Sequence, residues 1–294
     1  MKRITVLGAT SLIGHFLLPE LHRTGWQITA VSRKDPPENQ KRADASVRWL
    51  RHDISTSPLS FTCEEIVVSL APLWVLGDML SKAAHPPARI LAFSSTSVIT
   101  KRNSPNPGEQ YLATRLAAGE DALRRYAGKH AIDWTILRPT LVYGAGLDHN
   151  VSMIARFIRR IHFFPLIGTA TGKRMPVHAM DLSQAIIQCL ESSATGGQIY
   201  TVSGGETLSY KEMVCRIFAA LGSKQRIIPV PTLLARGLIR GAALLPQFSG
   251  LTPEMAERTS QDLVFDHDAA TRDFGYAPRS FRPTRADLLQ SDPD

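Results

Sequence analysis

The chain begins with a stretch whose glycine spacing suits a phosphate-containing ligand. Residues 4–14 read ITVLGATSLIG. Gly8 stands where a strand-to-helix turn must be tight, and Gly14 where the helix must pack closely on the strand. Ser11 occupies the middle position, where backbone N–H groups approach a pyrophosphate, and a serine is small enough to allow that approach. A dinucleotide site therefore fits the spacing, as does a strand-turn-helix without a ligand when these residues are taken alone.

Further polar residues along the same half of the chain favour the ligand. The second apolar run ends AVSRK, which places Ser32 and Arg33 where the adenosine ribose of a dinucleotide would lie. A carboxylate there would bind the ribose 2′-hydroxyl, whereas an arginine favours a 2′-phosphate. Asp53 follows the third run and is placed to accept from the adenine amino group. Arg33 alone is typical of a solvated surface, but three such features in register predict a bound dinucleotide, NADP(H) first and NAD(H) as the alternative.

Short apolar runs alternate with helical patterns through the first half of the chain. Runs rich in Val, Ile, Leu and Ala that alternate with helices indicate a parallel sheet covered on both faces. The predicted fold class is α/β, a Rossmann-type doubly wound parallel sheet with a smaller C-terminal substrate lobe. A helix is predicted over 110–129, and strands are predicted at Arg3–Leu7, Gln27–Val31, Val47–Leu50, Ile66–Leu70, Arg89–Ser94 and Asp133–Leu137.

The pattern changes after Tyr143, where a loop precedes an amphipathic basic helix and then a strand and helix with Asp181 as the expected N-cap. A capping box from Ser209 to Glu212 predicts a helix that ends at Gly222.

These patterns predict two regions. Residues 1–148 form the dinucleotide-binding domain, to which 175–202 return, and residues 149–174 and 203–294 form the smaller lobe. Within that lobe, the amphipathic basic segment 231–246 is expected to pack in the core rather than lie on a membrane.

Composition limits the classes of function. The chain has 294 residues, 44% of them hydrophobic, which is enough to bury a large core. No apolar run is long enough to span a bilayer and only MKR precedes the first strand, so we expect a cytoplasmic protein without stable membrane insertion. The net charge of +8 comes from Lys and Arg spread along the chain, which suits an anionic small substrate at least as well as nucleic acid, and we expect no nucleic-acid partner. The three cysteines lack metal-ligand spacing, so no metal is expected.

Seven segments carry a resemblance to a known family over nearly the whole chain. They are GATSLIG, DIS, FSSTSVI, YLATR, LRPTLVYGAG, RMPVHAMDLSQAI and DHDAATRDFGYAP. The sequence resembles the extended and atypical short-chain dehydrogenase/reductases of the NAD-dependent epimerase/dehydratase family, which act largely on nucleotide sugars. The resemblance also implies a small-molecule nucleotide sugar as partner and is compatible with a homodimer.

The resemblance implies a catalytic set. In FSSTSVI the hydroxyl that polarises the substrate carbonyl would be Thr96 or Ser95, because the shortened motif leaves the register open. In YLATR, Tyr111 would be the general acid/base that moves a proton while a hydride moves at the nicotinamide. Arg115 stands where the family has lysine, and its charge could still stabilise the phenolate. Restoring lysine at position 115 is therefore expected to preserve or raise turnover.

The resemblance also implies binding residues. Arg174 matches an arginine that contacts the nucleotide diphosphate, and Asn150 resembles a substrate-pocket asparagine, although GLDHN fits a plain helix cap equally well. The segment VSLAPLW, at the end of the fourth predicted strand, is bulkier than usual and is expected to place Trp74 near the cofactor, which indicates an atypical subfamily. The implied cofactor-binding residues are Gly8, Thr10, Ser11, Leu12, Ile13, Gly14, Ser32, Arg33, Asp53, Leu70, Ala71 and Pro139.

Two functions follow from these expectations. The first is an NAD(P)-dependent oxidoreductase or epimerase that acts by hydride transfer on a nucleotide-sugar-like substrate. The second is a non-catalytic Rossmann protein that binds dinucleotide as a structural or sensing ligand. Tyr111, the Ser95–Thr96 pair and Arg174 favour the first, and Arg115 favours the second.

Overall fold

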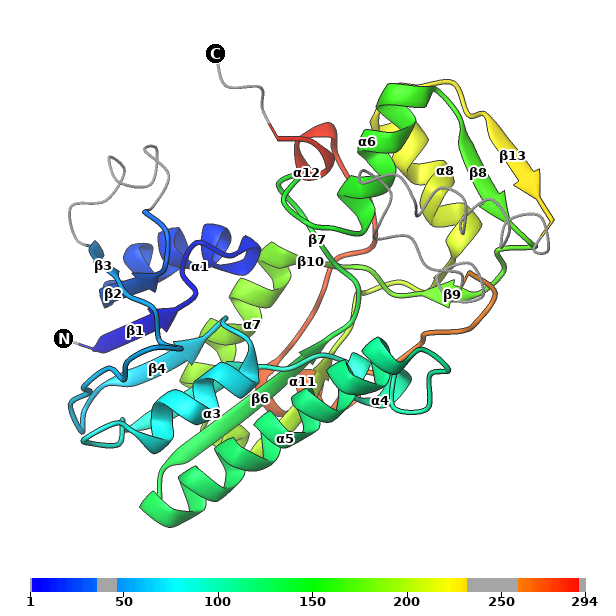
Figure 1. The fold of residues 1–294 in the computed structure, drawn as a ribbon. Helices are drawn as coiled ribbons and strands as arrows, with labels where there is room; N and C mark the ends of the chain where they lie inside the picture. Colours follow the sequence, from blue (N-terminus) through cyan, green and yellow to red (C-terminus); the bar gives the residue numbers. More distant parts are fainter. Residues whose placement is uncertain (1, 36–46, 232–258, 291–294) are drawn as a thin grey trace. The chain divides into compact units, whose positions relative to one another are not determined.

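The structure is a computed structural model that describes residues 2–35, 47–231 and 259–290 (Figure 1). The chain divides into two compact units. Unit 1 comprises Met1–Thr140, Ala179–Val202 and Asp266–Ala277, and unit 2 comprises Leu141–His178, Ser203–Phe265 and Pro278–Asp294.

Unit 1 is built on a seven-stranded sheet in the order β11-β6-β5-β4-β1-β2-β3, in which every neighbouring pair is parallel. Its register sets Leu7 of β1 opposite Val31 of β2 and Ser69 of β4. The Rossmann-type sheet predicted from the sequence is therefore confirmed. Its strands are β1 (Arg3–Leu7), β2 (Gln27–Ser32), β3 (Val47–Arg51), β4 (Ile66–Ser69), β5 (Arg89–Phe93), β6 (Asp133–Pro139) and β11 (Gln198–Val202).

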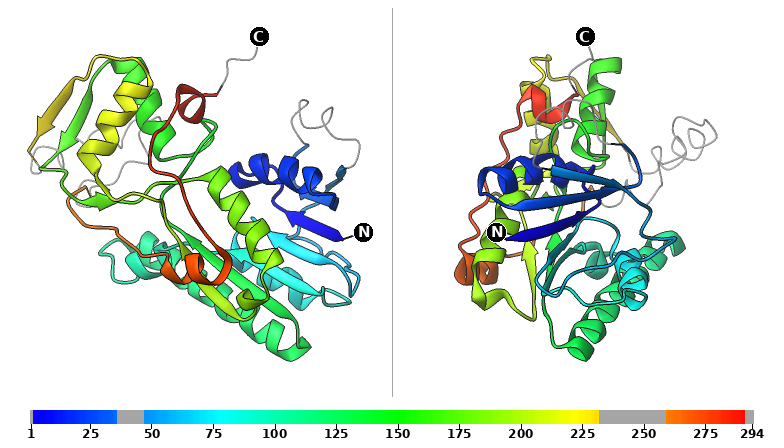
Figure 2. Two further views of the ribbon diagram at one scale, coloured as in Figure 1. Left: turned by 180° about the vertical axis from the view of Figure 1, so that it is seen from behind. Right: turned by 90° about the vertical axis from the view of Figure 1, so that its left-hand side faces the viewer.

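Helices cover both faces of this sheet, as Figures 1 and 2 show. Helices α3 (Leu73–Ser81) and α5 (Pro107–His130) pack together, and α1 (Leu12–Arg23) packs with α7 (Ala179–Glu191). On the α3 side, Leu76 and Leu123 join sheet residues in one buried cluster. The shorter elements of unit 1 are α4 (Ser97–Thr100), the 3-10 helix η1 (Ser193–Thr195) and α11 (Asp268–Phe274).

Unit 2 is a smaller layer of helices and paired short strands. Its core joins α6 (Val151–Ile161), α8 (Tyr210–Ala220) and α12 (Arg285–Leu288). Its strand pairs are β7 (Val142–Tyr143) with β10 (Val177–His178), β8 (Phe164–Ile167) with β13 (Ile227–Val230), and β9 (Lys173–Arg174) with β12 (Leu208–Ser209).

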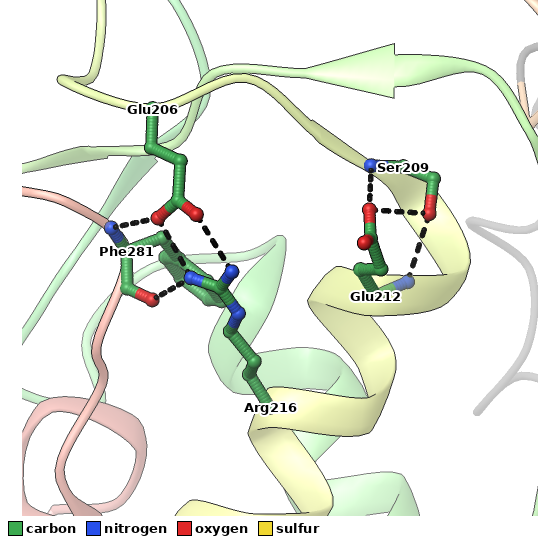
Figure 3. A network of polar contacts seen from close by, with 5 residues as sticks. All are labelled: Glu206, Ser209, Glu212, Arg216 and Phe281. Carbon is green, nitrogen blue, oxygen red and sulfur yellow. Dashed lines mark hydrogen bonds and ion pairs between the residues drawn. The ribbon is translucent and has the colours of Figure 1, made fainter.

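Two separate groups of polar contacts fix α8, one at its N-terminal end and one in its middle, and Figure 3 shows both. The Ser209–Glu212 capping box predicted from the sequence is present, and Gly222 follows the helix with a φ of 65°. Arg216, further along α8, pairs with Glu206 at 2.6 Å and donates to the carbonyl of Phe281 at 2.8 Å. The guanidinium of Arg216 thus ties α8 to the segment that precedes α12.

The structure corrects three of the sequence-based boundaries. Asp181 is not an N-cap, because α7 begins at Ala179 and Asp181 lies in its first turn. Helix α5 begins at Pro107, earlier than predicted, because the side chain of Asn106 accepts from the first-turn N–H groups. Residues 266–277, which the sequence assigned to the smaller lobe, lie in unit 1, where α11 contacts α7 and β11. All but the first residue of segment 231–246 lies outside the described residues.

Candidate functional site

The loop after β1 has the geometry that its glycines predict. Gly8 has a φ of 73°, and a Cβ there would lie 3.0 Å from the backbone nitrogen of Ala71. A Cβ at Gly14 would lie 2.1 Å from the carbonyl oxygen of Ala9, so α1 and the turn approach too closely for any side chain. Both positions therefore need glycine for steric reasons that local helix or strand propensity does not supply.

Ser11 begins α1 rather than merely leaving room for a ligand. Its hydroxyl accepts from the N–H of Gly14 at 3.2 Å, which makes it the N-cap. The N–H groups of Leu12 and Ile13 lie in the first turn, where a helix offers them no backbone acceptor. The positive end of the helix dipole also lies here, so the turn provides donors and a favourable potential for a phosphate.

This cradle fits the pyrophosphate of a dinucleotide. The backbone of Leu70 and Ala71 closes one side of it against Gly8. The hydroxyl of Ser69, at the end of β4, is buried and has no hydrogen-bond partner among the described residues. Crowded backbone with no room for side chains, next to first-turn N–H groups, is what close approach to a pyrophosphate requires.

The residues at the end of β2 continue the same edge of the sheet. The hydroxyls of Thr10 and Ser32 lie 2.8 Å apart, and Ser32 also accepts from the N–H of Lys34 at 3.1 Å. Ser32 is buried, whereas Arg33 is exposed and has no hydrogen bond or ion pair with any described residue. Ser32 thus serves the turn, and the charge of Arg33 stays available to an anion.

Asp53 is already committed to its own loop. Its carboxylate accepts from the N–H and the hydroxyl of Ser55, at 2.9 and 2.6 Å. These hydrogen bonds lower the pKa of Asp53, and the bond from the Ser55 hydroxyl has the larger effect. The nearby charge of Arg33 lowers the pKa further. One carboxylate oxygen, Oδ1, makes both contacts, so an adenine amino group would have to use the other.

The hydroxyls of Ser95 and Thr96, just after β5, differ in whether they donate a hydrogen bond to the backbone. Thr96 is 7% exposed, and its hydroxyl donates to the carbonyl of Pro139 at 3.1 Å. Ser95 is partly exposed, and its hydroxyl accepts from the N–H of Ser97 at 3.1 Å. The hydrogen of Ser95 is therefore the one that is not already donated to the backbone.

Tyr111, Arg115 and Gly119 follow one another at four-residue spacing on α5, which places them on one face of the helix. Tyr111 is 64% exposed. The Cζ of Arg115 lies 4.2 Å from the centroid of the Trp74 ring and 5.6 Å from that of Tyr111. The tyrosine and arginine of the YLATR motif are thus in contact, and the Trp74 ring contacts the same arginine.

A buried ion pair lies at the next residue of α5, Glu120. Glu120, 2% exposed, accepts from the hydroxyl of Ser94 at 2.5 Å and pairs with Arg138, whose Nε lies 2.9 Å away. The group joins α5 to the ends of β5 and β6. A buried carboxylate held by a guanidinium and a hydroxyl fixes these three elements relative to one another.

In unit 2, Asn150 does not cap α6, although it stands at the N-cap position. Asp148 supplies the acceptor instead, since its carboxylate receives the N–H groups of Asn150 and Ser152 at 2.9 and 3.0 Å. The side chain of Asn150 is exposed and is left free of the capping role.

Arg174 is held within unit 2. It is 6% exposed, and its Nη1 donates to the carbonyls of Lys173 and Gln261 at 2.8 and 2.6 Å. Its guanidinium also lies over the ring of Tyr210, 5.7 Å from the centroid. The burial of Tyr210 raises the pKa of its phenol to about 12, against the opposing effect of the Arg174 charge.

His178 is a paired strand residue. Its Nε2 lies 3.0 Å from a carboxylate oxygen of Asp287 on α12, and its ring packs edge-on against Tyr143. Burial acts to raise the pKa of Asp287, but hydrogen bonds from His178 and Thr284 outweigh it and hold the value at about 2. The pair links β10 to α12.

Sequence reasoning missed three contributors. Trp74 was expected near the cofactor but not against Arg115, and the Glu120–Arg138 pair was not anticipated. Gly119 was also missed, although its spacing of four from Arg115 and eight from Tyr111 was a usable signal of a crowded helix face. Within unit 1, the residues of the glycine loop form one group and the residues of the α5 face form another. Asn150 and Arg174 belong to unit 2.

Within the described residues, no helix is long and apolar enough to cross a membrane. The same residues contain no cluster of three or more His, Cys, Asp or Glu that could hold a metal ion.

Comparisons with known proteins agree with this architecture. The model of the NAD dependent epimerase/dehydratase family matches residues 74–203. The UDP-glucuronic acid 4-epimerase of Bacillus cereus, solved in complex with UDP-glucuronic acid and NAD, is similar in fold with a TM-score of 0.71. It is 15% identical, and the match covers 98% of this chain and 96% of that one.

Relatives by sequence are distant. UDP-glucose 4-epimerase of Vibrio cholerae is 29% identical over 125 residues, which are 42% of this chain and 38% of that protein. The 2-alkyl-3-oxoalkanoate reductase of Stenotrophomonas maltophilia is 26% identical over 94% of this chain and 95% of the reductase. The 40 kDa subunit of the mitochondrial NADH-ubiquinone oxidoreductase of Neurospora crassa is 22% identical over 98% of this chain and 78% of the subunit.

A protein of Sinorhizobium fredii is 30% identical over 184 residues. The chain spans less than half the length of this relative and of the V. cholerae epimerase. The resemblance predicted from the sequence is confirmed for residues 74–203, which match the model of the NAD dependent epimerase/dehydratase family, and the sheet of unit 1 is of the Rossmann type.

Proposed function

We propose that the chain is a nicotinamide-dependent oxidoreductase or epimerase that transfers a hydride to or from a nucleotide-sugar-like substrate. One observation carries this proposal. Unit 1 combines a glycine cradle at the start of α1 with an exposed tyrosine that lies next to a cation on α5. The cradle suits a dinucleotide, and the tyrosine with its cation suits proton transfer to a substrate oxygen.

Each polar residue has a role in this scheme. A bound nicotinamide would supply or accept the hydride. For reduction, the hydroxyl of Ser95 donates to the substrate carbonyl, and Tyr111 gives its proton to the oxygen as the hydride reaches the carbon. The charge of Arg115 stabilises the phenolate that remains until a proton returns from solvent. Oxidation reverses these steps, and oxidation followed by reduction on the other face gives epimerisation.

We propose Ser95 rather than Thr96 as the donor because Thr96 already gives its hydrogen to the carbonyl of Pro139. Thr96 then serves to hold the end of β5 against the end of β6.

The preferred cofactor in this proposal is NADP(H). Arg33 is an exposed cation directly after β2 and makes no hydrogen bond or ion pair with a described residue. The nearest carboxylate along the chain, Asp35, pairs with Arg51 at 3.4 Å. A guanidinium suits the 2′-phosphate. The B. cereus structure contains NAD, so the choice of cofactor is a point on which this chain would differ from that protein.

For the substrate, we propose that Asn150 and Arg174 recognise the nucleotide part. Asn150 has an exposed side chain that its helix does not use. Arg174 carries charge but already donates to two carbonyls, so we expect its replacement to lower stability as well as affinity for a diphosphate. The nucleotide-sugar class rests on the relatives and neighbours that bear the names of UDP-sugar epimerases.

A second function is a non-catalytic dinucleotide-binding protein. Arg115 in place of the family lysine favours it, since a guanidinium does not relay a proton. The similarity to a subunit of an NADH-ubiquinone oxidoreductase favours it as well. In this case Tyr111 would have no role in any rate.

The test is an assay of NADPH and NADH oxidation at 340 nm against a panel of nucleotide 4-keto sugars, with calorimetric titration of both dinucleotides in parallel. Turnover with at least one substrate supports the enzyme. Dinucleotide binding without turnover on any member of the panel would favour the binding protein, and the absence of dinucleotide binding would contradict both.

A further inference from the structure

The guanidinium of Arg115 is held by aromatic rings rather than by hydrogen bonds. Its Cζ lies over the Trp74 ring at 4.2 Å and near the Tyr111 ring at 5.6 Å. Among the described residues it has no hydrogen bond and no ion pair. This differs from Arg138 and Arg216, whose guanidinium groups are paired with carboxylates.

Gly119 explains why Trp74 reaches Arg115. A Cβ at Gly119 would lie 2.9 Å from the backbone nitrogen of Trp74 and 3.0 Å from the carbonyl carbon of Leu73. The first residues of α3 therefore lie directly on α5 at Gly119, one turn beyond Arg115. This close approach fixes the Trp74 ring beside the Arg115 side chain.

The contact has a geometric consequence for the donors of Arg115. A guanidinium is planar, and its N–H bonds lie in that plane. A guanidinium that meets a ring with its face leaves its N–H edge unobstructed, and the 4.2 Å from Cζ to the Trp74 centroid fits such a contact. The stack thus restricts the orientation of the group while its donors stay available to a ligand.

We propose that Trp74 is a positioning residue that orients Arg115, so that its N–H edge meets a pair of oxygens of the nicotinamide-bearing ribose beside Tyr111. This inference rests on the proposed function, and it adds the residue through which the atypical arginine works. It reverses one expectation from the sequence: Arg115→Lys should impair the site rather than restore it. A lysine ammonium is a point charge that cannot lie flat on the indole and present two parallel donors.

The test is calorimetric titration of NADPH and NADH into the wild type, Trp74→Leu, Trp74→Phe and Arg115→Lys. We expect Trp74→Leu to weaken the tighter dinucleotide about 3- to 10-fold, the range of a partly exposed cation–π contact. Trp74→Phe keeps an aromatic face and should recover most of this loss. Arg115→Lys should weaken binding by a similar factor, whereas Arg125→Lys, an exposed arginine on the same helix, should have no effect.

A double-mutant cycle separates positioning from support of the fold. In an Arg115→Met background, Trp74→Leu should have no further effect on dinucleotide affinity, because Trp74 acts through Arg115. A full, additive loss in that background would overturn the proposal. So would unchanged affinity in Trp74→Leu, or wild-type affinity in Arg115→Lys, even if dinucleotide binding itself were secure. If the wild type binds no dinucleotide, the proposed function fails and this inference fails with it.

Discussion

Arg115 in unit 1 and Arg174 in unit 2 show how differently one side chain can be held. Arg174 is 6% exposed and gives its Nη1 hydrogens to two backbone carbonyls. Arg115 rests on aromatic rings and makes no hydrogen bond with a described residue. An arginine whose donors serve the fold contributes to stability first, and one whose donors are unused is available for a ligand.

The same contrast extends to the neighbours of each arginine. In unit 2, His178 is buried against Asp287 and Tyr143. In unit 1, Tyr111 is 64% exposed, and Arg33 is exposed and makes no hydrogen bond or ion pair with a described residue. Substitutions at Tyr111, Arg115 and Arg33 should therefore change activity and binding with little loss of stability, while substitutions at Arg174 and His178 should lower stability.

The largest expected effect is on turnover in Tyr111→Phe. Loss of the phenolic proton should lower kcat by about 10²- to 10⁴-fold, the usual contribution of general acid–base catalysis. Because the side chain is exposed, the free energy of unfolding should hardly change. Tyr126→Phe on the same helix is the matched control, since the Tyr126 hydroxyl is buried without a hydrogen-bond partner among the described residues. Retained turnover in Tyr111→Phe, measured at 340 nm, would remove this residue from the mechanism.

The next effect is on stability in Arg174→Met. This change removes the charged donor to the carbonyl of Gln261 and one of the two donors to the carbonyl of Lys173, which keeps the N–H of Leu263. A hydrogen bond that involves a charged group contributes about 1.5–3 kcal/mol. Denaturant unfolding should therefore show a loss of about 2–3 kcal/mol. Arg115→Met should lose less than about 1 kcal/mol in the same measurement, because only a partly exposed cation–π contact disappears. Equal losses in the two variants would erase the contrast between the two arginines.

A somewhat smaller effect is the acid sensitivity of the His178–Asp287 pair. The folded pKa of Asp287 is about 2 and the ordinary value is 3.8, so the folded state favours the ionised carboxylate. Its contribution to stability is present above pH 4 and is lost as the pH falls from about 4 to about 2.

The difference between the folded and ordinary pKa values of Asp287 corresponds to about 2 kcal/mol in the free energy of unfolding. Asp287→Asn should lose most of that amount at neutral pH and should flatten the pH dependence of unfolding between pH 4 and 2. Denaturant titrations across this range would contradict the account if the wild type and Asp287→Asn had parallel profiles.

The smallest effect expected is the change of cofactor preference in Arg33→Ala. Loss of one exposed charge-assisted contact to a 2′-phosphate should weaken NADPH about tenfold. The affinity for NADH should stay the same, because NADH has no 2′-phosphate. Calorimetry in which both dinucleotides weaken equally would place Arg33 away from the adenosine ribose.

The sequence predicted those features that depend on local steric requirements. The roles of Gly8 and Gly14 could be read directly, because backbone crowding at these positions admits no other residue. The alternation of strands and helices predicted the parallel sheet, because burial on both faces makes each strand a nearly continuous apolar run.

Contacts between distant segments left no such trace. Trp74 and Arg115 meet because Gly119 lets α3 lie on α5. The spacing of Gly119 from Arg115 indicates a crowded helix face, but it does not identify α3 as the neighbour. Likewise, GLDHN offered two capping residues of similar propensity, and the structure uses Asp148 rather than Asn150. Asp181 was misplaced because an acidic residue suits the first helical turn as well as the N-cap.

The most direct test of the central claim follows the hydride itself. A nucleotide 4-keto sugar is incubated with the wild type and NADPH deuterated at both C4 positions of the nicotinamide ring, and the sugar is analysed by mass spectrometry. The account predicts deuterium at the reduced carbon with the wild type and with Tyr126→Phe, and at least about a hundredfold less with Tyr111→Phe in the same time. Tight binding of the dinucleotide and the keto sugar with no deuterium in any product would contradict it.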